Sequence, residues 1–156
     1  MKTATLLYIK NRKDEYLLMK RKKEPNKGRL SPPGGKLDQT IAETPLACAV
    51  REANEECSII STESDWKLKG IICERNFPGA GNIMIFLMEY GKLTERIPEE
   101  CEEGDFYFIH PDKFAEYEIP ETDRLFIWDK YLKSDKEVFI TGLDCTDYPL
   151  IKVVTS

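Results

Sequence analysis

The chain has 156 residues, of which 41% are hydrophobic and 33% are charged, and its formal net charge is −5. These values are typical of one soluble globular domain with a sizeable core, and they exclude a largely disordered chain or an integral membrane protein. The pI of about 5.1 argues against a general nucleic-acid-binding protein, although a small anionic ligand held in one local site is compatible with it.

The N-terminal sequence is interpreted as a first strand, because its apolar part is too short for a signal peptide and lacks a small-residue cleavage pattern. No apolar run approaches the length of a membrane span. The five cysteines are irregularly spaced without a CxxC pair, which favours reduced, mostly buried thiols over a structural zinc site. We therefore expect a cytoplasmic monomer or homodimer that binds neither nucleic acid nor membrane.

The first half of the chain predicts a hairpin, a long loop and a helix. Residues 3–10 and 16–21 are apolar and β-prone, and the polar segment between them favours a hairpin. Residues 22–43 hold three of the nine prolines and three of the nine glycines, and a long loop inside a compact domain is usually functional. Thr44 is suited to cap a helix that ends near Cys57, with proline at its first position.

The second half of the chain mixes predicted strands and helices without strict alternation. The pattern indicates strands over 66–77, 82–90 and 105–109, helices over 111–117 and 121–133, and a closing hairpin over 137–143 and 148–154. This mixture predicts an α+β fold in which helices pack on a largely mixed sheet.

The segment AVREANEECSI, residues 49–59, concentrates negative charge on one edge of the predicted helix. Glu55 and Glu56 lie three and four residues after Glu52, and like-charge pairs at this spacing destabilise an isolated helix by about 0.2–0.5 kcal/mol each. A solvated acidic face is one interpretation. The other is a site for a hard divalent cation, because Mg²⁺ takes carboxylate oxygens together with water and phosphate. The apolar stripe expected to pack on the sheet consists of Leu46, Val50, Ala53 and Cys57.

The sequence SPPGGK, which precedes the helix, favours the cation interpretation. Gly34 and Gly35 allow the backbone to approach a ligand closely. Glu43 stands at the helix entrance, and Arg51 is placed to neutralise one carboxylate and fix its direction. A bound cation would remove the remaining repulsion between the carboxylates.

Together these residues resemble the Nudix box of the Nudix hydrolases, in which a glycine, five residues, a glutamate and seven residues precede Arg-Glu-apolar-any-Glu-Glu-any-Gly-apolar. The chain matches the second half of this pattern in spacing from Glu43 to Ile59. It departs from the pattern by two extra residues between Gly35 and Glu43 and by Ser58 in place of the glycine. The resemblance implies one Nudix domain over residues 1–156, an α/β/α sandwich with a mixed sheet and a loop-helix-loop catalytic motif.

The resemblance also implies an activity and a set of roles. Nudix hydrolases cleave a nucleoside diphosphate linked to another group, with water as nucleophile and Mg²⁺ or Mn²⁺ as cofactor. Glu52 is the candidate general base, and Glu43 would pair with Arg51 to hold the loop on the helix. The metal ligands implied by the resemblance are Glu52, Glu55, Glu56 and the carbonyl of Gly35.

Two further positions leave alternatives open. Glu102 or Glu103, just before the strand over 105–109, resembles the additional acidic metal ligand of many family members, and a solvated acidic loop is the alternative. Lys36 would contact a phosphate or would lie on the surface. The basic run over residues 20–29 would draw a polyphosphate towards the site, or it is simply a charged strand end.

The overall layout is similar to that of the oxidised-purine nucleoside triphosphatases within the family. Those enzymes carry base-reading acids beside a tryptophan at the place of residues 118–124. Here Ile119 replaces the tryptophan, and Glu121 and Asp123 are the acids left to bind a base. The alternative is that these acids begin a helix, where negative charge is favourable.

The expected reaction is therefore hydrolysis of a nucleoside triphosphate to the monophosphate and pyrophosphate, with 8-oxo-dGTP among the candidate substrates. One alternative is hydrolysis of another nucleotide derivative, such as ADP-ribose or a dinucleoside polyphosphate. Another is a non-catalytic nucleotide-sensing module. Such modules usually lose glutamates of the box, and all four of those glutamates are present here.

Overall fold

The computed structural model describes residues 1–24 and 26–155. Within these residues, nine strands form one sheet in the order β3-β2-β1-β6-β5-β8-β9, with β4 paired to β1 and β7 paired to β2. The strands are β1 (Lys2–Lys10), β2 (Tyr16–Arg21), β3 (Leu30–Ser31), β4 (Gly34–Lys36), β5 (Trp66–Phe77), β6 (Gly81–Leu93), β7 (Gly104–Ile109), β8 (Phe139–Asp144) and β9 (Lys152–Thr155). The helical segments are α1 (Pro45–Cys57), η1 (Glu63–Asp65), η2 (Pro111–Glu116), η3 (Asp123–Ile127) and α2 (Trp128–Lys133).

The sheet is mixed, because β1 pairs with β6 and β5 pairs with β8 in parallel, while the other pairs are antiparallel. The predicted hairpins β1–β2, β5–β6 and β8–β9 are confirmed. In the pairing of β4 with β1, Gly35 lies opposite Thr5. This pairing places the glycine pair at the sheet, next to the start of the acidic helix.

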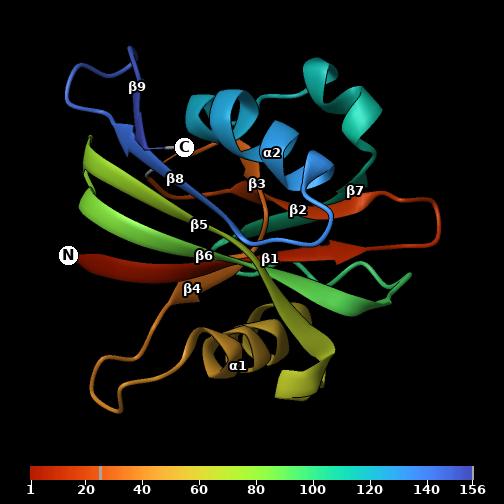
Figure 1. Ribbon diagram of the computed structural model, residues 1–156. Coiled ribbons are helices and arrows are strands. Elements are labelled where there is room, and N and C mark those ends of the chain that lie inside the picture. The colour runs from red at the N-terminus through yellow and green to blue at the C-terminus, as the bar shows by residue number, and fades with distance from the viewer. Residues whose placement is uncertain (25, 156) are drawn as a thin grey trace.

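Helices cover both faces of the sheet, which confirms the predicted α+β fold (Figure 1). Helix α1 lies on one face, over a core that includes Leu7, Leu17 and Met88. Segments η2, η3 and α2 lie on the opposite face, over a second core that includes Tyr8 and Ile72. The structure is therefore an α/β/α sandwich.

An aromatic cluster dominates the core beneath α2. Tyr8 stacks on Tyr131 at a centroid distance of 4.0 Å, and it meets Trp128 edge-on at 5.1 Å. Such pairs contribute about 0.5–1.5 kcal/mol each beyond the area that they bury. The Tyr131 hydroxyl donates to Glu89 Oε2 at 2.8 Å. The cluster fixes α2 on the sheet and, with it, the segment that leads into α2.

Three predicted elements differ in detail. The expected loop over 22–43 contains the two short strands β3 and β4, because residues 30–31 pair with β2 and residues 34–36 pair with β1. The helix expected over 111–117 is a tight 3₁₀ helix over 111–116. The helix expected over 121–133 contains a π-helical turn over 123–127, and this wider turn brings both Asp123 and Ile127 into buried positions.

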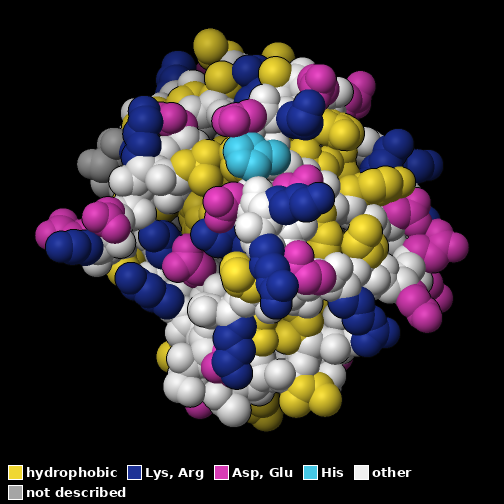
Figure 2. Space-filling model, turned by 90° about the vertical axis from the view of Figure 1, so that its right-hand side faces the viewer, with side chains coloured by type: hydrophobic (Ala, Val, Ile, Leu, Met, Phe, Trp, Pro, Cys, Tyr) yellow, Lys and Arg dark blue, Asp and Glu magenta, His cyan; other side chains and the backbone are white. Residues whose placement is uncertain are grey.

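All five cysteines are free thiols, and three of them are buried, which agrees with the prediction of reduced, mostly buried thiols. No helix in the described part of the chain is long and apolar enough to span a membrane. Figure 2 shows one face of the molecule, on which lysine and arginine side chains are interspersed with acidic ones rather than gathered into one basic surface.

Candidate active site

Helix α1 begins where the sequence predicted, but it presents a different face to the sheet. The hydroxyl of Thr44 accepts a hydrogen bond from the Ala47 backbone N–H at 3.1 Å, and proline occupies the first turn. Leu46, which was expected to be buried, is 36% exposed. Small residues allow the helix to approach the sheet closely, and the carboxylate of Glu52 enters the buried face with them. The buried residues of α1 are Cys48, Ala49, Glu52, Ala53 and Cys57.

Ser58 ends the helix in a left-handed conformation, with φ 55° and ψ 31°. Its N–H donates to the Asn54 carbonyl at 3.2 Å, and the N–H of Ile59 donates to the Ala53 carbonyl at 3.0 Å. These bonds satisfy carbonyls that the helix leaves unpaired at its end. Serine thus adopts the backbone conformation for which glycine is usually required, and the turn after the helix is kept.

Arg51 organises the acidic edge of the helix. Its Nε and Nη2 atoms donate to the two carboxylate oxygens of Glu43, each at 2.8 Å. Its Nη1 atom donates to Glu52 Oε1 at 2.9 Å and to Glu55 Oε2 at 3.2 Å. Its Nη2 atom also donates to the Lys36 carbonyl at 3.0 Å. One guanidinium therefore holds three carboxylates and the glycine-bearing strand β4 together, which confirms the expected pairing of Arg51 with Glu43.

The longer loop before the helix preserves this pairing. The Asp38 backbone N–H donates to Glu43 Oε1 at 3.0 Å, and the Glu43 N–H donates back to the Asp38 carbonyl at 3.1 Å. Thr40 closes a local turn on Asp38, with its hydroxyl donating to Oδ1 at 2.6 Å. Ala42 takes a left-handed conformation with φ 50°. The two extra residues are thus absorbed in a turn, and Glu43 still reaches Arg51.

Gly35 leaves room for the Glu52 carboxylate. A Cβ atom added at Gly35 would overlap that carboxylate, whereas one added at Gly34 would overlap the backbone carbonyl of Thr5. Both positions therefore require glycine, for two different reasons. The Gly35 carbonyl lies near the Thr5 hydroxyl, at 3.4 Å, and the Cys48 thiol, at 3.9 Å, and Gly35 pairs with Thr5 in the sheet.

The pKa values of the carboxyl groups on this edge move in opposite directions. Hydrogen bonds from Arg51 lower the pKa of Glu43 to about 2. Burial raises the pKa of Glu52, and the favourable contact with Arg51 offsets only part of that effect. Burial also raises the pKa of Glu56, and the charges of Glu103 and Glu55 add to it. The acidic edge therefore combines Glu43, whose ionised form is stabilised by Arg51, with Glu52 and Glu56, whose ionised forms are disfavoured by burial.

The loop between β6 and β7 approaches the far end of the helix. The thiol of Cys101 donates to Glu56 Oε2 at 3.6 Å, and Glu103 is close enough for its charge to raise the pKa of Glu56. Glu102 is exposed and makes no hydrogen bond or ion pair with the described residues. Of the two predicted positions, Glu103 is the one near the acidic edge. Lys36 is exposed, and it is its backbone carbonyl that meets Arg51.

The donor set suits a hard divalent cation. It consists of carboxylate oxygens and one backbone carbonyl, which are ligands that Mg²⁺ accepts. In residues 1–24 and 26–155, no three acidic, histidine or cysteine side chains already converge as a metal-binding group. The reason is visible in the contacts, since Glu52 and Glu55 both turn to Arg51.

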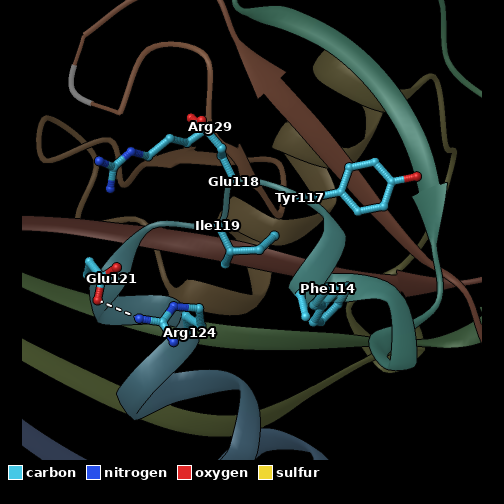
Figure 3. Close-up of a pocket in the computed structure, with 8 residues that line it drawn as sticks. Arg29, Phe114, Tyr117, Glu118, Ile119, Glu121 and Arg124 are labelled. Atoms are coloured by element: carbon cyan, nitrogen blue, oxygen red, sulfur yellow. Dashed lines mark hydrogen bonds and ion pairs between the residues drawn. The ribbon is translucent and has the colours of Figure 1, made fainter.

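The two predicted base-binding acids lie apart from this edge and differ from each other. Glu121 forms an ion pair with Arg124 at 2.8 Å and lines a pocket of about 490 Å³, together with Arg29, Phe114 and Ile119 (Figure 3). Asp123 is buried instead, and burial raises its pKa to about 7. The structure therefore brings together the residues of the box, and it separates them from Glu121 and Asp123.

Sequence reasoning missed several residues that complete the site. Cys48 lies between β4 and Arg51, and Arg51 Nη2 donates to its sulfur at 3.7 Å. Its position three residues before Arg51 would have placed it on the same helical edge. Neither Cys101 nor Thr5 carries a sequence signal of this kind, because each reaches the site only through the folding of the sheet.

Comparison with known proteins agrees with this geometry. A sequence profile of the NUDIX domain matches residues 1–131. A MutT protein from Bacillus halodurans is 20% identical, with a TM-score of 0.75 over 99% of this chain and 95% of that chain. The dihydroneopterin triphosphate pyrophosphohydrolase of E. coli is 17% identical, with a TM-score of 0.64 over 83% and 94% of the two chains. The NUDIX domain of Shewanella oneidensis NrtR, solved with ADP ribose, is 13% identical, with a TM-score of 0.66 over 85% of each chain.

At these identities the solved structures show a shared fold. The match to the NUDIX domain profile shows family membership as well, because it spans well over half of the chain. The matched residues include the glycine pair, the acidic helix and the Arg51 contacts. The chain therefore belongs to the Nudix hydrolase family.

Proposed function

We propose that this Nudix hydrolase converts a nucleoside triphosphate to the monophosphate and pyrophosphate, with Mg²⁺ as cofactor and Mn²⁺ as a substitute. The observation that carries the proposal is the contact of Arg51 with Glu43, Glu52 and Glu55, which gathers carboxylates beside the glycine strand. We also propose that residues 1–156 form one domain, since the closing hairpin extends the sheet through the pairing of β8 with β5.

The cation would be held by the acidic edge of α1. Its proposed ligands are the carboxylates of Glu52, Glu55 and Glu56 and the Gly35 carbonyl. Glu103 is preferred to Glu102 as the additional acid, because its charge acts on Glu56. When bound, the cation supplies positive charge that screens the phosphate oxygens from an incoming nucleophile.

Glu52 is the proposed general base. The oxygen of a water molecule bonds to one of the two phosphorus atoms beside the α–β bridging oxygen, the bridging P–O bond breaks, and Glu52 takes a proton from the water. Arg51 fixes the direction of the Glu52 carboxylate through the bond at 2.9 Å. Lys36 and the basic run over 20–29 supply positive charge for the polyphosphate.

Purine triphosphates, with 8-oxo-dGTP among them, are the proposed substrates. ADP-ribose is a second candidate, because the NrtR domain that shares this fold was solved with ADP ribose. A purely sensing module is disfavoured, since Glu43, Glu52, Glu55 and Glu56 are all present and Arg51 contacts three of them.

The test is a screen for pyrophosphate and phosphate release with Mg²⁺, using dGTP, 8-oxo-dGTP, the other dNTPs, ADP-ribose and diadenosine polyphosphates. Pyrophosphate from one or more triphosphates, abolished by EDTA, is the expected result. Glu55→Gln and Glu56→Gln should each lower turnover about 100-fold or more while the fold survives. Glu137→Gln, which changes an exposed acid away from the helix, is the matched control. Full Mg²⁺-dependent activity in both Glu55 and Glu56 variants would show that the metal assignment is wrong.

A further inference from the structure

A small hollow lies where the loop before β3, the end of β5 and the loop after β8 meet. It is lined by two aromatic side chains, Phe77 and Tyr148, by the cations Lys27 and Arg29, and by Glu24. Its volume is about 270 Å³. Ligand pockets usually measure about 300–1,000 Å³, so this hollow suits a single ring system with its substituent.

The hollow carries positive charge that the chain leaves unpaired. In the part of the chain that the structure describes, the side chains of Lys27 and Arg29 form no hydrogen bond or ion pair. Two cations and the single acid Glu24 leave the described lining with a net positive charge. Arg29 is half-buried, and the planar donors of a guanidinium match the oxygens of a phosphate group. The lining therefore favours an anionic ligand.

Arg29 also lines the larger pocket of about 490 Å³, together with Phe114 and Tyr117. Figure 3 shows its guanidinium on the side away from these two aromatic rings. The charge of Arg29 is thus free to act on a ligand in the small hollow.

Phe77 and Tyr148 form an aromatic wall whose position is fixed by the chain. Their rings meet edge-on, with centroids 5.4 Å apart. Asn76 ties the two segments together, because its side-chain N–H donates to the Thr146 hydroxyl at 2.8 Å. Its backbone N–H donates to Asn82 Oδ1 at 3.0 Å, which fixes the turn between β5 and β6. A planar ring that packs on this wall therefore meets side chains that are already ordered.

The loop that carries Arg29 also borders the acidic edge of α1. The Arg21 N–H donates to the Arg29 carbonyl at 3.0 Å, and the N–H of the next residue, Lys22, donates to the Glu103 carbonyl at 2.9 Å. Glu103 belongs to the loop that contacts Glu56, one of the proposed metal ligands. Hydrogen-bonded backbone thus connects the hollow to the edge where the phosphate groups are proposed to react.

Tyr148 comes from a part of the chain beyond the match to the NUDIX profile, which ends at residue 131. The loop that carries it is folded onto β5, because the Tyr148 N–H donates to the Cys145 carbonyl at 3.1 Å and the Cys145 N–H donates to the Arg75 carbonyl at 2.9 Å. The C-terminal segment therefore extends the sheet and also closes one side of the hollow.

We propose that this hollow binds the nucleotide substrate, with Arg29 on a phosphate group and the ring of the base packed against Tyr148 and Phe77. Tyr148 is then a specificity-determining residue that the C-terminal segment supplies. This inference rests on the proposed function, which makes the substrate a nucleotide. Stacking on an aromatic side chain tolerates every base, since every base has a π-face. The hollow thus favours nucleotides over sugar phosphates without choosing among the bases.

The first test maps the site on the full chain by NMR. The isotope-labelled protein is titrated with dGMP in EDTA, so that binding is observed without metal or hydrolysis. We expect the largest amide shifts in residues 26–29, 77–78 and 147–149, which form or flank the walls of the hollow. Largest shifts outside these three segments, or no shift at millimolar dGMP, would overturn the proposal without requiring any variant to fold.

Two pairs of variants separate the ring contact from the phosphate contact. Tyr148→Ala should weaken dGMP binding about tenfold, whereas Tyr148→Phe keeps the ring and should retain the native affinity. Arg29→Gln should also weaken dGMP binding about tenfold, and Arg29→Lys should recover part of the loss, because it keeps the charge without the planar donors. The matched controls Tyr107→Ala and Arg96→Gln change exposed residues that do not line the hollow, and they should bind as the native chain does.

A merely structural role for Tyr148 predicts a different result. Tyr148→Ala would then lower the urea midpoint, through the lost contact with Phe77, but would leave the affinity of the folded protein for dGMP unchanged. Unchanged affinity in both Tyr148→Ala and Arg29→Gln would overturn the proposal.

Hydrolysis kinetics keep this inference separate from the proposed function. With a dNTP and Mg²⁺, Tyr148→Ala and Arg29→Gln should each raise KM about tenfold more than they lower kcat, because their contacts are made equally in the bound substrate and the transition state. Native KM values in both variants would overturn the inference while the activity stands. The expected dGMP shifts without cleavage of any triphosphate would support the site and overturn the proposed activity.

Discussion

Arg51 binds Glu43 at two points, with Nε donating to Oε2 and Nη2 donating to Oε1, both at 2.8 Å. The Glu43 side chain is only 4% exposed, whereas the Arg51 side chain is 33% exposed, so the pair is shielded from water on its carboxylate side. The same guanidinium reaches Glu52 and Glu55 and therefore links the loop before α1 to the acidic edge of the helix.

Replacement of Arg51 by lysine tests this link. Lysine keeps the charge but cannot reproduce the planar, two-point contact with Glu43 while it also reaches Glu52. We expect Arg51→Lys to lower kcat/KM about 100-fold and the free energy of unfolding by about 1–3 kcal/mol. Steady-state kinetics and urea unfolding measure the two effects. Arg12→Lys, on the exposed surface, is the control and should resemble the native chain. An active, equally stable Arg51→Lys variant would contradict the organising role.

Replacement of Ser58 by glycine tests how much the left-handed backbone conformation of this serine costs at the end of the helix. Glycine adopts this conformation without steric penalty, so Ser58→Gly should raise the free energy of unfolding by about 0.5–1 kcal/mol. Ser134→Gly is a matched control, because Ser134 caps α2 with φ −72° and glycine gains nothing there. Urea unfolding of both variants is the measurement. Destabilisation in both would show that the left-handed conformation carries no relievable strain.

Alanine substitutions at the two adjacent glycines are expected to have different effects on activity and stability. In Gly35→Ala the new methyl group meets the Glu52 carboxylate, which can move, so activity should fall about 100-fold while most of the stability remains. In Gly34→Ala the methyl group meets the Thr5 backbone, so the pairing of β4 with β1 should suffer and the urea midpoint should drop. Kinetics and unfolding on the same samples decide the matter, and the reverse pattern would refute this reading of the contacts.

Stability should fall as pH rises from 5 to 8. The pKa values of Glu74 and Asp123 are raised to about 7, so the folded chain binds their protons more tightly than the unfolded chain does. Their contribution is favourable below the ordinary carboxyl pKa near 4, and it is lost as pH rises towards 7. The lowered pKa of Glu43 acts with the opposite sign, but only below about pH 4.

Urea unfolding from pH 5 to pH 8 measures this dependence. Asp123→Asn carries no titrating group at that position and should flatten the profile. Its free energy of unfolding should gain most, relative to the native chain, at pH 8. Glu137→Gln, at an exposed position, should leave the slope as it is. A native profile that is flat, or that rises over this range, would show that the two acids are paired in a way that keeps them ionised.

Much of the site could be predicted from the sequence, because its geometry is local. Helix spacing alone places Glu52, Glu55 and Glu56 on one edge, and the cap residue Thr44 sets where the helix starts. The pairing of Glu43 with Arg51 was expected from the resemblance to the Nudix box, because Glu43 lies before the helix and helix spacing does not relate the two residues. The hairpins β1–β2 and β5–β6 also follow from adjacent β-prone segments joined by turn residues.

The rotation of α1 on the sheet could not be read from its pattern. The helix buries Glu52 and exposes Leu46, because the small residues Cys48, Ala49 and Ala53 allow it to sit close to the strands. Packing against the sheet, rather than the hydrophobicity of single residues, therefore determined which face is buried.

The sequence by itself determined the Nudix box, the helix that carries it and the order of charges along its edge, since each depends on residues within a few turns of one another. Only the tertiary structure decided that Cys101 reaches Glu56, that the charge of Glu103 acts on Glu56, and that Glu74 and Asp123 are both buried. These residues are far apart in the chain, and no local spacing relates them. These arrangements arise from the order of strands in the sheet and from the side of it that each segment covers.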